Sequence, residues 1–285
     1  MEIGLIGTGL MGLPMAERLL NTGFSLMAYN RTAEKLVPLQ KLGVAIAPSP
    51  QQLIQTSTCI ILMLTNAEAI REVVLSAACR AELAGKTVIQ MGTIAPAESR
   101  ALQADILAAG GDYLEAPVLG SIPEVQSGKL IVMVGATSEQ FEQWQEVLSC
   151  FGPNPRLIGP VGAAAAVKLA LNQLIGSLTS AFATSLGFIQ RQHASVDLFM
   201  EILRESALYA PTFDKKLQRM LDRNYEHPNF PTKHLAKDMG LFLTEAQSLG
   251  LNPELVMAVQ SILTKTLELG LADKDYSALF SAVSQ

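Results

Sequence analysis

The chain has 285 residues, of which 49% are hydrophobic and 16% charged, and its net charge at pH 7 is −5. This length allows two modest domains with a sizeable core, and the apolar composition excludes a disordered chain. The acidic balance, without a basic run longer than two residues, argues against nucleic acid as a partner, because phosphate binding needs clustered lysine and arginine.

Cysteine and histidine are few, and neither type has the spacing of metal ligands. We therefore predict free thiols in a reducing compartment, the cytoplasm, and no metal site. These residues are Cys59, Cys79, Cys150, His193, His227 and His234.

The first half of the chain alternates short apolar runs with amphipathic stretches. The pattern predicts strands at residues 3–6, 24–29, 59–64, 87–91 and 130–134. Helices are predicted between them at 10–21, 33–42, 67–75, 96–109 and 138–151. This alternation is typical of a doubly wound α/β domain, in which helices cover both faces of a parallel sheet.

The pattern changes after about residue 161. Helices are predicted at 163–190, 196–206, 212–222, 233–249 and 253–269, with almost no strand signal. We thus expect an α/β domain over residues 1–161 and an all-α domain, for substrate binding and oligomerisation, over residues 162–285. Residues 169–190 carry no charge, but their polar side chains and the lack of a second span favour a buried joining helix over a membrane span. Such a helix suggests a homo-oligomer, either a dimer or a tetramer.

A glycine-rich loop directly follows the first predicted strand. It reads Gly7-Thr8-Gly9-Leu10-Met11-Gly12 and opens a helix, which is the context of a dinucleotide-binding turn. The first glycine permits the tight turn, the second allows the backbone to approach a pyrophosphate, and the third allows close packing of helix and strand. The start of the helix would then face the phosphates, as in a Rossmann domain.

The second predicted strand ends in Asn30-Arg31-Thr32 rather than in an acidic residue. A carboxylate at this point would bind the ribose hydroxyls of NAD and repel a 2′-phosphate. Arg31 can instead pair with a phosphate, and Asn30 and Thr32 add neutral donors. The sequence therefore predicts NADP rather than NAD.

Four segments in order, over nearly the whole chain, resemble the β-hydroxyacid dehydrogenase family. That family includes 3-hydroxyisobutyrate dehydrogenase, tartronate semialdehyde reductase, 6-phosphogluconate dehydrogenase and the glyoxylate/succinic semialdehyde reductases. The segments are Gly4-Leu5-Ile6 with the glycine loop, Glu115-Ala116-Pro117-Val118-Leu119-Gly120-Ser121 continuing to Gly128-Lys129-Leu130, Gly159-Pro160-Val161-Gly162 with Lys168 and Asn172, and Lys237-Asp238.

The resemblance implies a role for particular residues. Lys168 would be the catalytic lysine, with Asn172 on the same helix face fixing the lysine or binding the same substrate oxygen. Met63, Leu64 and Thr93, with Thr65 and Asn66, would line the cofactor, and Ser121 with the backbone of Gly120 would anchor a substrate carboxylate. Further candidates with open roles are Lys237 (cofactor or carboxylate), Asp238 (substrate or Lys168) and Phe230 (a pocket cover or an ordinary core aromatic).

Leu119 departs from the family pattern, which usually has a serine that donates to the substrate carboxylate. This variant, with Asn229-Phe230-Pro231, most resembles the glyoxylate/succinic semialdehyde reductase branch. A protonated lysine can hold the carbonyl oxygen and supply its proton during hydride transfer. We therefore expect NADPH-dependent reduction of a short carboxylate-bearing aldehyde, with a 3-hydroxyisobutyrate dehydrogenase or a tartronate semialdehyde reductase as the alternative.

Overall fold

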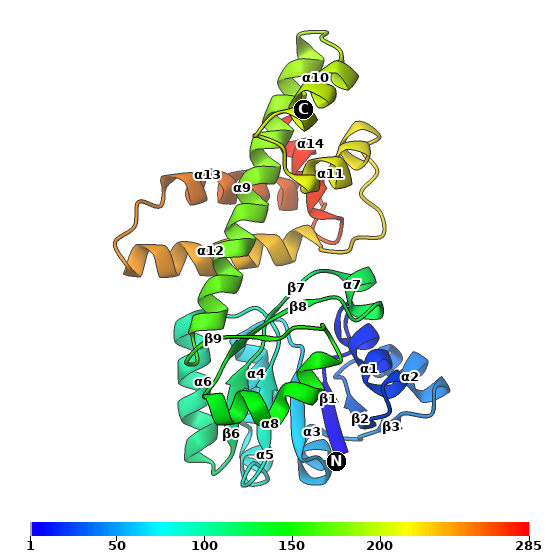
Figure 1. The fold of residues 1–285 in the computed structure, drawn as a ribbon, viewed down its shortest axis with the longest axis vertical. Coiled ribbons are helices and arrows are strands. Elements are labelled where there is room, and N and C mark those ends of the chain that lie inside the picture. Colours follow the sequence, from blue (N-terminus) through cyan, green and yellow to red (C-terminus); the bar gives the residue numbers. More distant parts are fainter. Residues whose placement is uncertain (1, 285) are drawn as a thin grey trace. The chain divides into compact units, whose positions relative to one another are not determined.

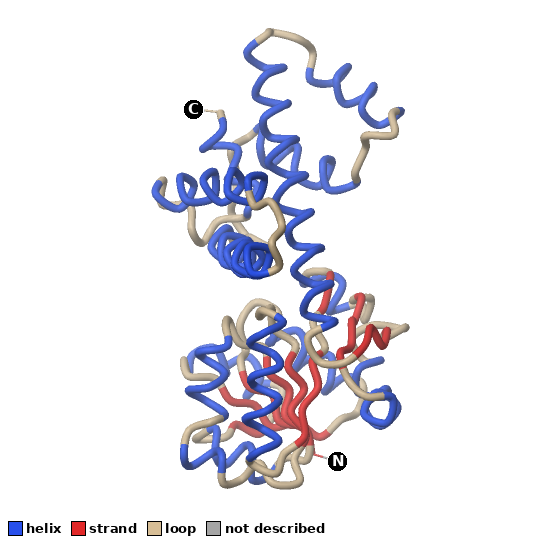
Figure 2. Tube along the Cα trace, turned by 90° about the vertical axis from the view of Figure 1, so that its left-hand side faces the viewer, coloured by secondary structure: helices blue, strands red, loops and turns tan. Residues whose placement is uncertain are grey.

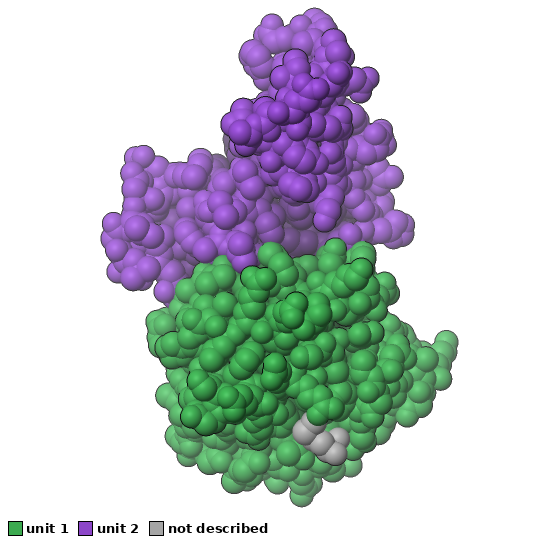
Figure 3. All heavy atoms as spheres, viewed as in Figure 1, with its two compact units in different colours: residues 1–168 green, residues 169–285 purple. Residues whose placement is uncertain are grey.

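The computed structural model describes residues 2–284 and divides into two compact units, residues 1–168 and 169–285 (Figure 3). The sequence places this boundary at 161/162, just before a long helix. In the structure the division falls inside that helix, α9 (Ala163–Arg191), whose first residues are held by the first unit.

The first unit is built on a nine-stranded sheet with the order β3-β2-β1-β4-β5-β6-β8-β7, and β9 pairs with β8 (Figure 1). Strands β1 to β6 are mutually parallel. The first six strands in this order follow the arrangement of a Rossmann domain, in which ligands bind at the carboxyl ends of the strands. The strands are β1 (Glu2–Ile6), β2 (Ser25–Tyr29), β3 (Ala45–Ile46), β4 (Cys59–Leu62), β5 (Thr87–Gln90), β6 (Asp112–Glu115), β7 (Val118–Leu119), β8 (Ile131–Gly135) and β9 (Arg156–Gly159).

Helices pack on both faces of this sheet, and each face has its own hydrophobic core. One face is covered by α1 (Gly12–Asn21), η1 (Ala33–Leu36), α2 (Val37–Lys41), α7 (Ile122–Gln126) and α8 (Ser138–Ser149). The other is covered by α3 (Pro50–Thr56), α4 (Ala67–Val74), α5 (Ala77–Arg80) and α6 (Pro96–Ala108). The central strands β4 and β5 are buried throughout. Burial on both faces explains why β4 is a continuous apolar run, whereas β5 has polar residues, Thr87 and Gln90, at its two ends.

The sheet differs from the sequence prediction at one edge. Strand β8 is antiparallel to β6 and β7, so the sheet is mixed rather than purely parallel. Strands β3, β6, β7 and β9 were not predicted. β3 and β7 have two residues each, β6 starts and ends with an acidic residue, and β9 begins with an arginine. Such segments lack the long apolar run that identifies a strand in a sequence.

The second unit consists of helices, as Figure 2 shows for this part of the chain. Besides the rest of α9 it contains α10 (Val196–Glu205), α11 (Pro211–Leu221), α12 (Thr232–Ser248), α13 (Glu254–Glu268), η2 (Tyr276–Ala278) and α14 (Leu279–Val283). One hydrophobic core joins them, and the rings of Phe182 on α9 and Phe213 on α11 stack within it at 4.7 Å. All five helices expected after residue 161 are present.

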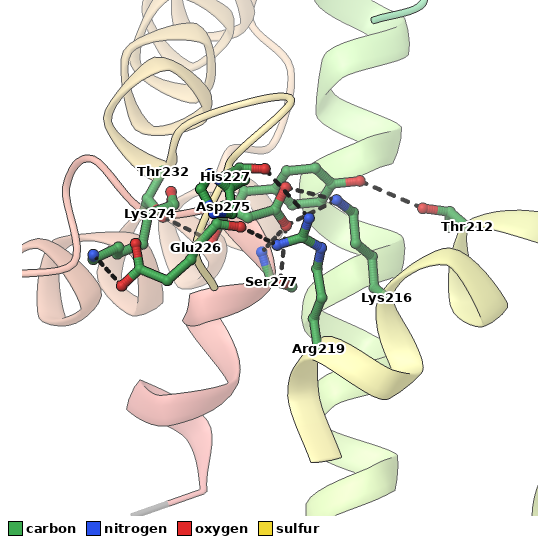
Figure 4. A network of polar contacts seen from close by, with 10 residues as sticks. Thr212, Lys216, Arg219, Glu226, His227, Thr232, Lys274, Asp275 and Ser277 are labelled. Carbon is green, nitrogen blue, oxygen red and sulfur yellow. Dashed lines mark hydrogen bonds and ion pairs between the residues drawn. The ribbon is translucent and has the colours of Figure 1, made fainter. Parts of the chain in front are cut away.

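A buried ion pair lies inside the second unit (Figure 4). Lys216 Nζ on α11 donates to both carboxylate oxygens of Asp275, at 2.8 and 2.9 Å. The Asp275 side chain is fully buried, and it also accepts from the backbone amide and hydroxyl of Ser277. This pair ties α11 to the segment before α14.

None of the helices described over residues 2–284 is both long and apolar enough to cross a membrane. The uncharged stretch 169–190 lies inside α9, which contributes Phe182, Ala183 and Leu186 to the core of the second unit. The three cysteines are free and buried. Within the same residues, no group of histidine, cysteine and acidic side chains has the arrangement of a metal site.

Candidate active site

The glycine loop connects β1 to α1 at the carboxyl edge of the sheet. Gly7 has a φ of +100°, and a Cβ there would lie 2.4 Å from the Met63 carbonyl oxygen, so both conformation and space require glycine. A Cβ on Gly12 would lie 1.8 Å from the Gly7 oxygen. A Cβ on Gly9, in contrast, would meet nothing within 4 Å. The loop is therefore tightly packed at Gly7 and Gly12 and open at Gly9.

The start of α1 suits an anionic group. No side chain caps it, and its first turn contains no acidic residue. The amides at the start of a helix carry partial positive charge and bind phosphate groups well. The open space at Gly9 and the uncapped helix together fit the pyrophosphate of a dinucleotide.

Asn30 and Arg31 lie at the end of β2, beside the glycine loop. The Thr8 amide donates to Asn30 Oδ1 at 3.1 Å, and Asn30 Nδ2 donates to the Thr32 carbonyl at 2.9 Å. Asn30 thus fastens the loop to β2, a structural task that the sequence did not reveal. Arg31 and Thr32 are exposed.

The residues expected near the rest of the cofactor follow the next two strands. Met63 and Leu64, both half-buried, follow β4, and the Met63 amide donates to the Ile6 carbonyl at 3.0 Å. Asn66 caps α4 through the Ala69 amide at 2.9 Å. Thr93 is half-buried after β5. All of these positions lie at the carboxyl edge of the sheet, where a Rossmann domain binds its ligand.

Ser121, the predicted carboxylate anchor, is engaged by a neighbouring side chain. Its amide and its hydroxyl both donate to Glu124 Oε2, at 2.8 and 2.7 Å. Gly120 before it has a φ of +133°, and a Cβ there would lie 2.6 Å from Leu130 Cδ2. The spacing of serine and glutamate is that of a capping box, a signal that the sequence contained.

Lys168 and Asn172 lie four residues apart on the continuous helix α9, so they share one face of it. Both are buried, with 9% and 1% of the residue exposed. The helix begins against Glu115 of β6, whose carboxylate Oε1 accepts the amides of Gly162 and Ala165. Glu115 stands in the family motif, but the sequence alone suggested no role for it.

Within the second unit, Asn172 lies beside Asp238 of α12. Asn172 Nδ2 donates to Asp238 Oδ2 at 2.6 Å, and Lys237 Nζ lies 2.9 Å from Asp238 Oδ1. Asn172 Oδ1 is buried without a hydrogen-bond partner in the described structure. The structure thus brings three predicted residues together and leaves one acceptor available to a lysine or a substrate hydroxyl.

Phe230 does not join that group. Its ring packs edge-on against Tyr276 at 5.7 Å, within the hydrophobic core of the second unit. This contact matches the alternative of an ordinary core aromatic, although the ring remains partly exposed.

Comparison with known proteins identifies the family. The family model for the NAD binding domain of 6-phosphogluconate dehydrogenase matches residues 2–159, and that for the NAD-binding of NADP-dependent 3-hydroxyisobutyrate dehydrogenase matches residues 162–283. Glyoxylate/succinic semialdehyde reductase 1 of Arabidopsis thaliana is 32% identical over 285 residues, covering 99% of this chain and 98% of that protein. The chain belongs to the β-hydroxyacid dehydrogenase family.

Two further relatives agree with this assignment. The 2-hydroxy-3-oxopropionate reductase of Escherichia coli K12 is 30% identical over 288 residues, covering 99% of this chain and 97% of that protein. The structure of Mycobacterium tuberculosis 3-hydroxyisobutyrate dehydrogenase matches with a TM-score of 0.90 and 21% identity, over 100% of this chain and 99% of that one, and it supports the fold. As a β-hydroxyacid dehydrogenase, the protein is an NAD(P)-dependent oxidoreductase of small molecules.

Proposed function

We propose that this enzyme uses NADPH to reduce short carboxylate-bearing aldehydes, glyoxylate and succinic semialdehyde, to hydroxy acids. The observation that carries the proposal is the full-length similarity to the Arabidopsis glyoxylate/succinic semialdehyde reductase. The lysine and asparagine that the proposed reaction uses are both present on α9, and both are buried.

The preference for NADPH rests on the end of β2. No carboxylate stands there to repel a 2′-phosphate, and Arg31 is exposed beside the glycine loop that the Asn30 side chain fastens. A guanidinium can bind a phosphate through two parallel hydrogen bonds.

Bound NADPH supplies the hydride that adds to the carbonyl carbon of the aldehyde. We assign Lys168 as the donor that holds the carbonyl oxygen and transfers a proton from Nζ to it, so that the alcohol forms and the lysine is left neutral. Asn172 would keep the lysine in place through its unpaired Oδ1. Its amide is oriented by Asp238, because Nδ2 donates to that carboxylate.

The substrate carboxylate would bind at Ser121 and the backbone of Gly120, with Lys237 as a further candidate. Both donors of Ser121 are held by Glu124 in the structure. A substrate carboxylate therefore has to replace Glu124 at these donors, or to share them. Asp238, which accepts a hydrogen bond from Asn172, would lie on the substrate side, whereas Phe230 packs against Tyr276 and is left out of this assignment.

A tartronate semialdehyde reductase or a 3-hydroxyisobutyrate dehydrogenase is the alternative. The 30% identity to the E. coli 2-hydroxy-3-oxopropionate reductase favours it. Leu119 counts against it, since the serine usual in the family at this position is absent.

The test is NADPH oxidation at 340 nm with glyoxylate, succinic semialdehyde, tartronate semialdehyde and methylmalonate semialdehyde. Fast turnover of the first two supports the proposal, and turnover confined to either of the last two supports the alternative.

Replacement of Lys168 by Ala should lower kcat at least ~100-fold, because general acid catalysis contributes about that much. NADPH affinity should be unchanged in that variant and in the control Lys41→Ala, an exposed lysine on α2. Near-normal turnover of Lys168→Ala would refute the role.

We further propose that the protein is a cytoplasmic homo-oligomer. Three free cysteines are compatible with a reducing compartment. Large apolar side chains on α9 and α10 are exposed in the single chain, among them Phe188 at 61% and Ile202 at 68%. Association of copies would bury such side chains.

A further inference from the structure

Glu115, the last residue of β6, ends in a fully buried carboxylate that accepts hydrogen bonds on both oxygens. Only 1% of the residue is exposed. Oε1 accepts the backbone amides of Gly162 at 2.8 Å and Ala165 at 3.0 Å, and Oε2 accepts the hydroxyl of Ser99. All three of these partners are donors, so both oxygens of the carboxylate serve as hydrogen-bond acceptors.

The proton positions around Glu115 follow from this arrangement. Ser99 has one hydroxyl proton, which it uses to donate the hydrogen bond to Glu115. The bond of 2.8 Å between Ser99 and Tyr113 must then be donated by the Tyr113 hydroxyl. Burial raises the pKa of Tyr113 well above its ordinary value, which keeps that phenol protonated. The result is a chain of bonds, all pointing toward Glu115.

The neighbouring strand leaves room for the carboxylate. Gly135 of β8 pairs with Glu115, and a Cβ at Gly135 would lie 2.5 Å from Glu115 Oε1. The φ of Gly135 is not positive, so glycine is needed there for space rather than for conformation. On the side of the sheet, the space for the carboxylate therefore exists because residue 135 has no side chain.

The helix that Glu115 holds is the one that carries Lys168. α9 has no acidic residue in its own first turn, so the capping carboxylate comes from the sheet. Lys168 follows one turn after Ala165, and the first helical residues belong to the same compact unit as β6. A negative group at this end also complements the helix dipole.

We propose that Glu115 is a positioning residue, which fixes the first turn of α9 to the end of β6 and thereby places Lys168 for proton donation. The inference rests on the proposed role of Lys168. Glu115 itself acts through the helix and contacts neither the cofactor nor the substrate in this assignment.

The experiment compares Glu115→Ala and Glu115→Gln in the full-length enzyme. Asp112→Asn is the matched control, because Asp112 starts the same strand and also accepts a backbone amide, that of Tyr113 at 2.9 Å. Hydrogen exchange of the Gly162 and Ala165 amides reports the capping, and kcat, KM and the Kd of NADPH report the site. Kinetics are measured well below the melting temperature of each variant.

For Glu115→Ala we expect exchange at these two amides to rise at least ~10-fold, since a lost cap opens the helix end locally. The kcat should fall by about 100-fold, the loss expected when a catalytic group is misplaced by about 1 Å. Glu115→Gln keeps the size of the side chain but loses its charge, so its losses should be smaller and in the same direction. The Kd of NADPH should stay within about twofold, and Asp112→Asn should change none of these values.

Faster exchange with an unchanged kcat in both variants would overturn the proposal, because Glu115 would then only stabilise the fold. Unchanged exchange would overturn it as well. If Glu115→Ala does not fold, Glu115→Gln decides between the same outcomes. If the unmodified enzyme reduces none of the four aldehydes, the proposed substrate class is refuted. Hydrogen exchange of the Gly162 and Ala165 amides would still show whether Glu115 holds the start of α9.

Discussion

We propose different tasks for two adjacent residues at the end of β2, although the sequence suggested the same one for both. Asn30 bonds to the Thr8 amide and the Thr32 carbonyl, so its side chain is used to hold the glycine loop. Arg31 is exposed and remains the residue expected to discriminate between cofactors. Cofactor preference is thus assigned to one side chain, and loop geometry to its neighbour.

Replacement of Arg31 by Ala should lower kcat/KM for NADPH by about 10- to 100-fold, because a charged hydrogen bond to phosphate is worth roughly 1.5–3 kcal/mol. The value for NADH should change little, since NADH has no 2′-phosphate. Steady-state kinetics with both cofactors measures this, with Lys41→Ala as a control on α2. A clear preference of the unmodified enzyme for NADH would contradict the assignment.

At the scale of elements, the turn between β1 and α1 shows how glycines of one motif serve different ends. Gly12 lies against the Gly7 carbonyl, whereas Gly9 faces open space. The lack of a side chain at Gly12 allows the helix to pack on the strand, whereas the lack of one at Gly9 leaves the backbone accessible to a ligand. Their replacement should therefore separate folding from cofactor binding.

We expect Gly9→Ala to fold with nearly unchanged stability, because its Cβ meets nothing within 4 Å and its φ is not positive. Its Kd for NADPH should rise at least ~10-fold, because the methyl group occupies the space through which a pyrophosphate reaches the backbone. Gly12→Ala should instead lose about 1–3 kcal/mol of stability through overpacking. Thermal unfolding and NADPH titration of both variants test this, and equal behaviour of the two would count against it.

For the molecule as a whole, one buried ion pair lies apart from the residues that we propose for the reaction. Lys216 and Asp275 form an ion pair with 10% and 0% of their side chains exposed, and the ammonium lies 4.1 Å from the centre of the Tyr276 ring. Burial lowers the pKa of Lys216, and Asp275 is the partner that opposes this effect. The proposed reaction makes no use of this pair.

Lys216→Met should lower the free energy of unfolding by about 3–5 kcal/mol, because it leaves a buried carboxylate without its counter-ion. The matched control is Arg204→Met, which breaks the exposed pair with Asp214 and should cost less than ~1 kcal/mol. Denaturant unfolding of the full chain followed by circular dichroism measures both. Similarly small losses of unfolding free energy in the two variants would show that the buried pair stabilises the protein no more than the exposed pair does.

The sequence by itself determined the features that depend on local pattern. Apolar periodicity identified the central strands and the five helices after residue 161, and the glycine loop identified the nucleotide-binding turn. The spacing of Lys168 and Asn172 placed both on one helix face, because a helix repeats every 3.6 residues. The order of the motifs was sufficient to indicate the family.

Only the tertiary structure decided which distant groups meet. The bonds from Glu115 to the start of α9 join residues 47 and 50 positions apart, and the bond between Asn172 and Asp238 spans 66 positions. No local pattern encodes such pairs, since they arise from the order of strands and the packing of helices. The sequence therefore predicted the residues that we propose for the reaction, whereas folding decided what holds them in place.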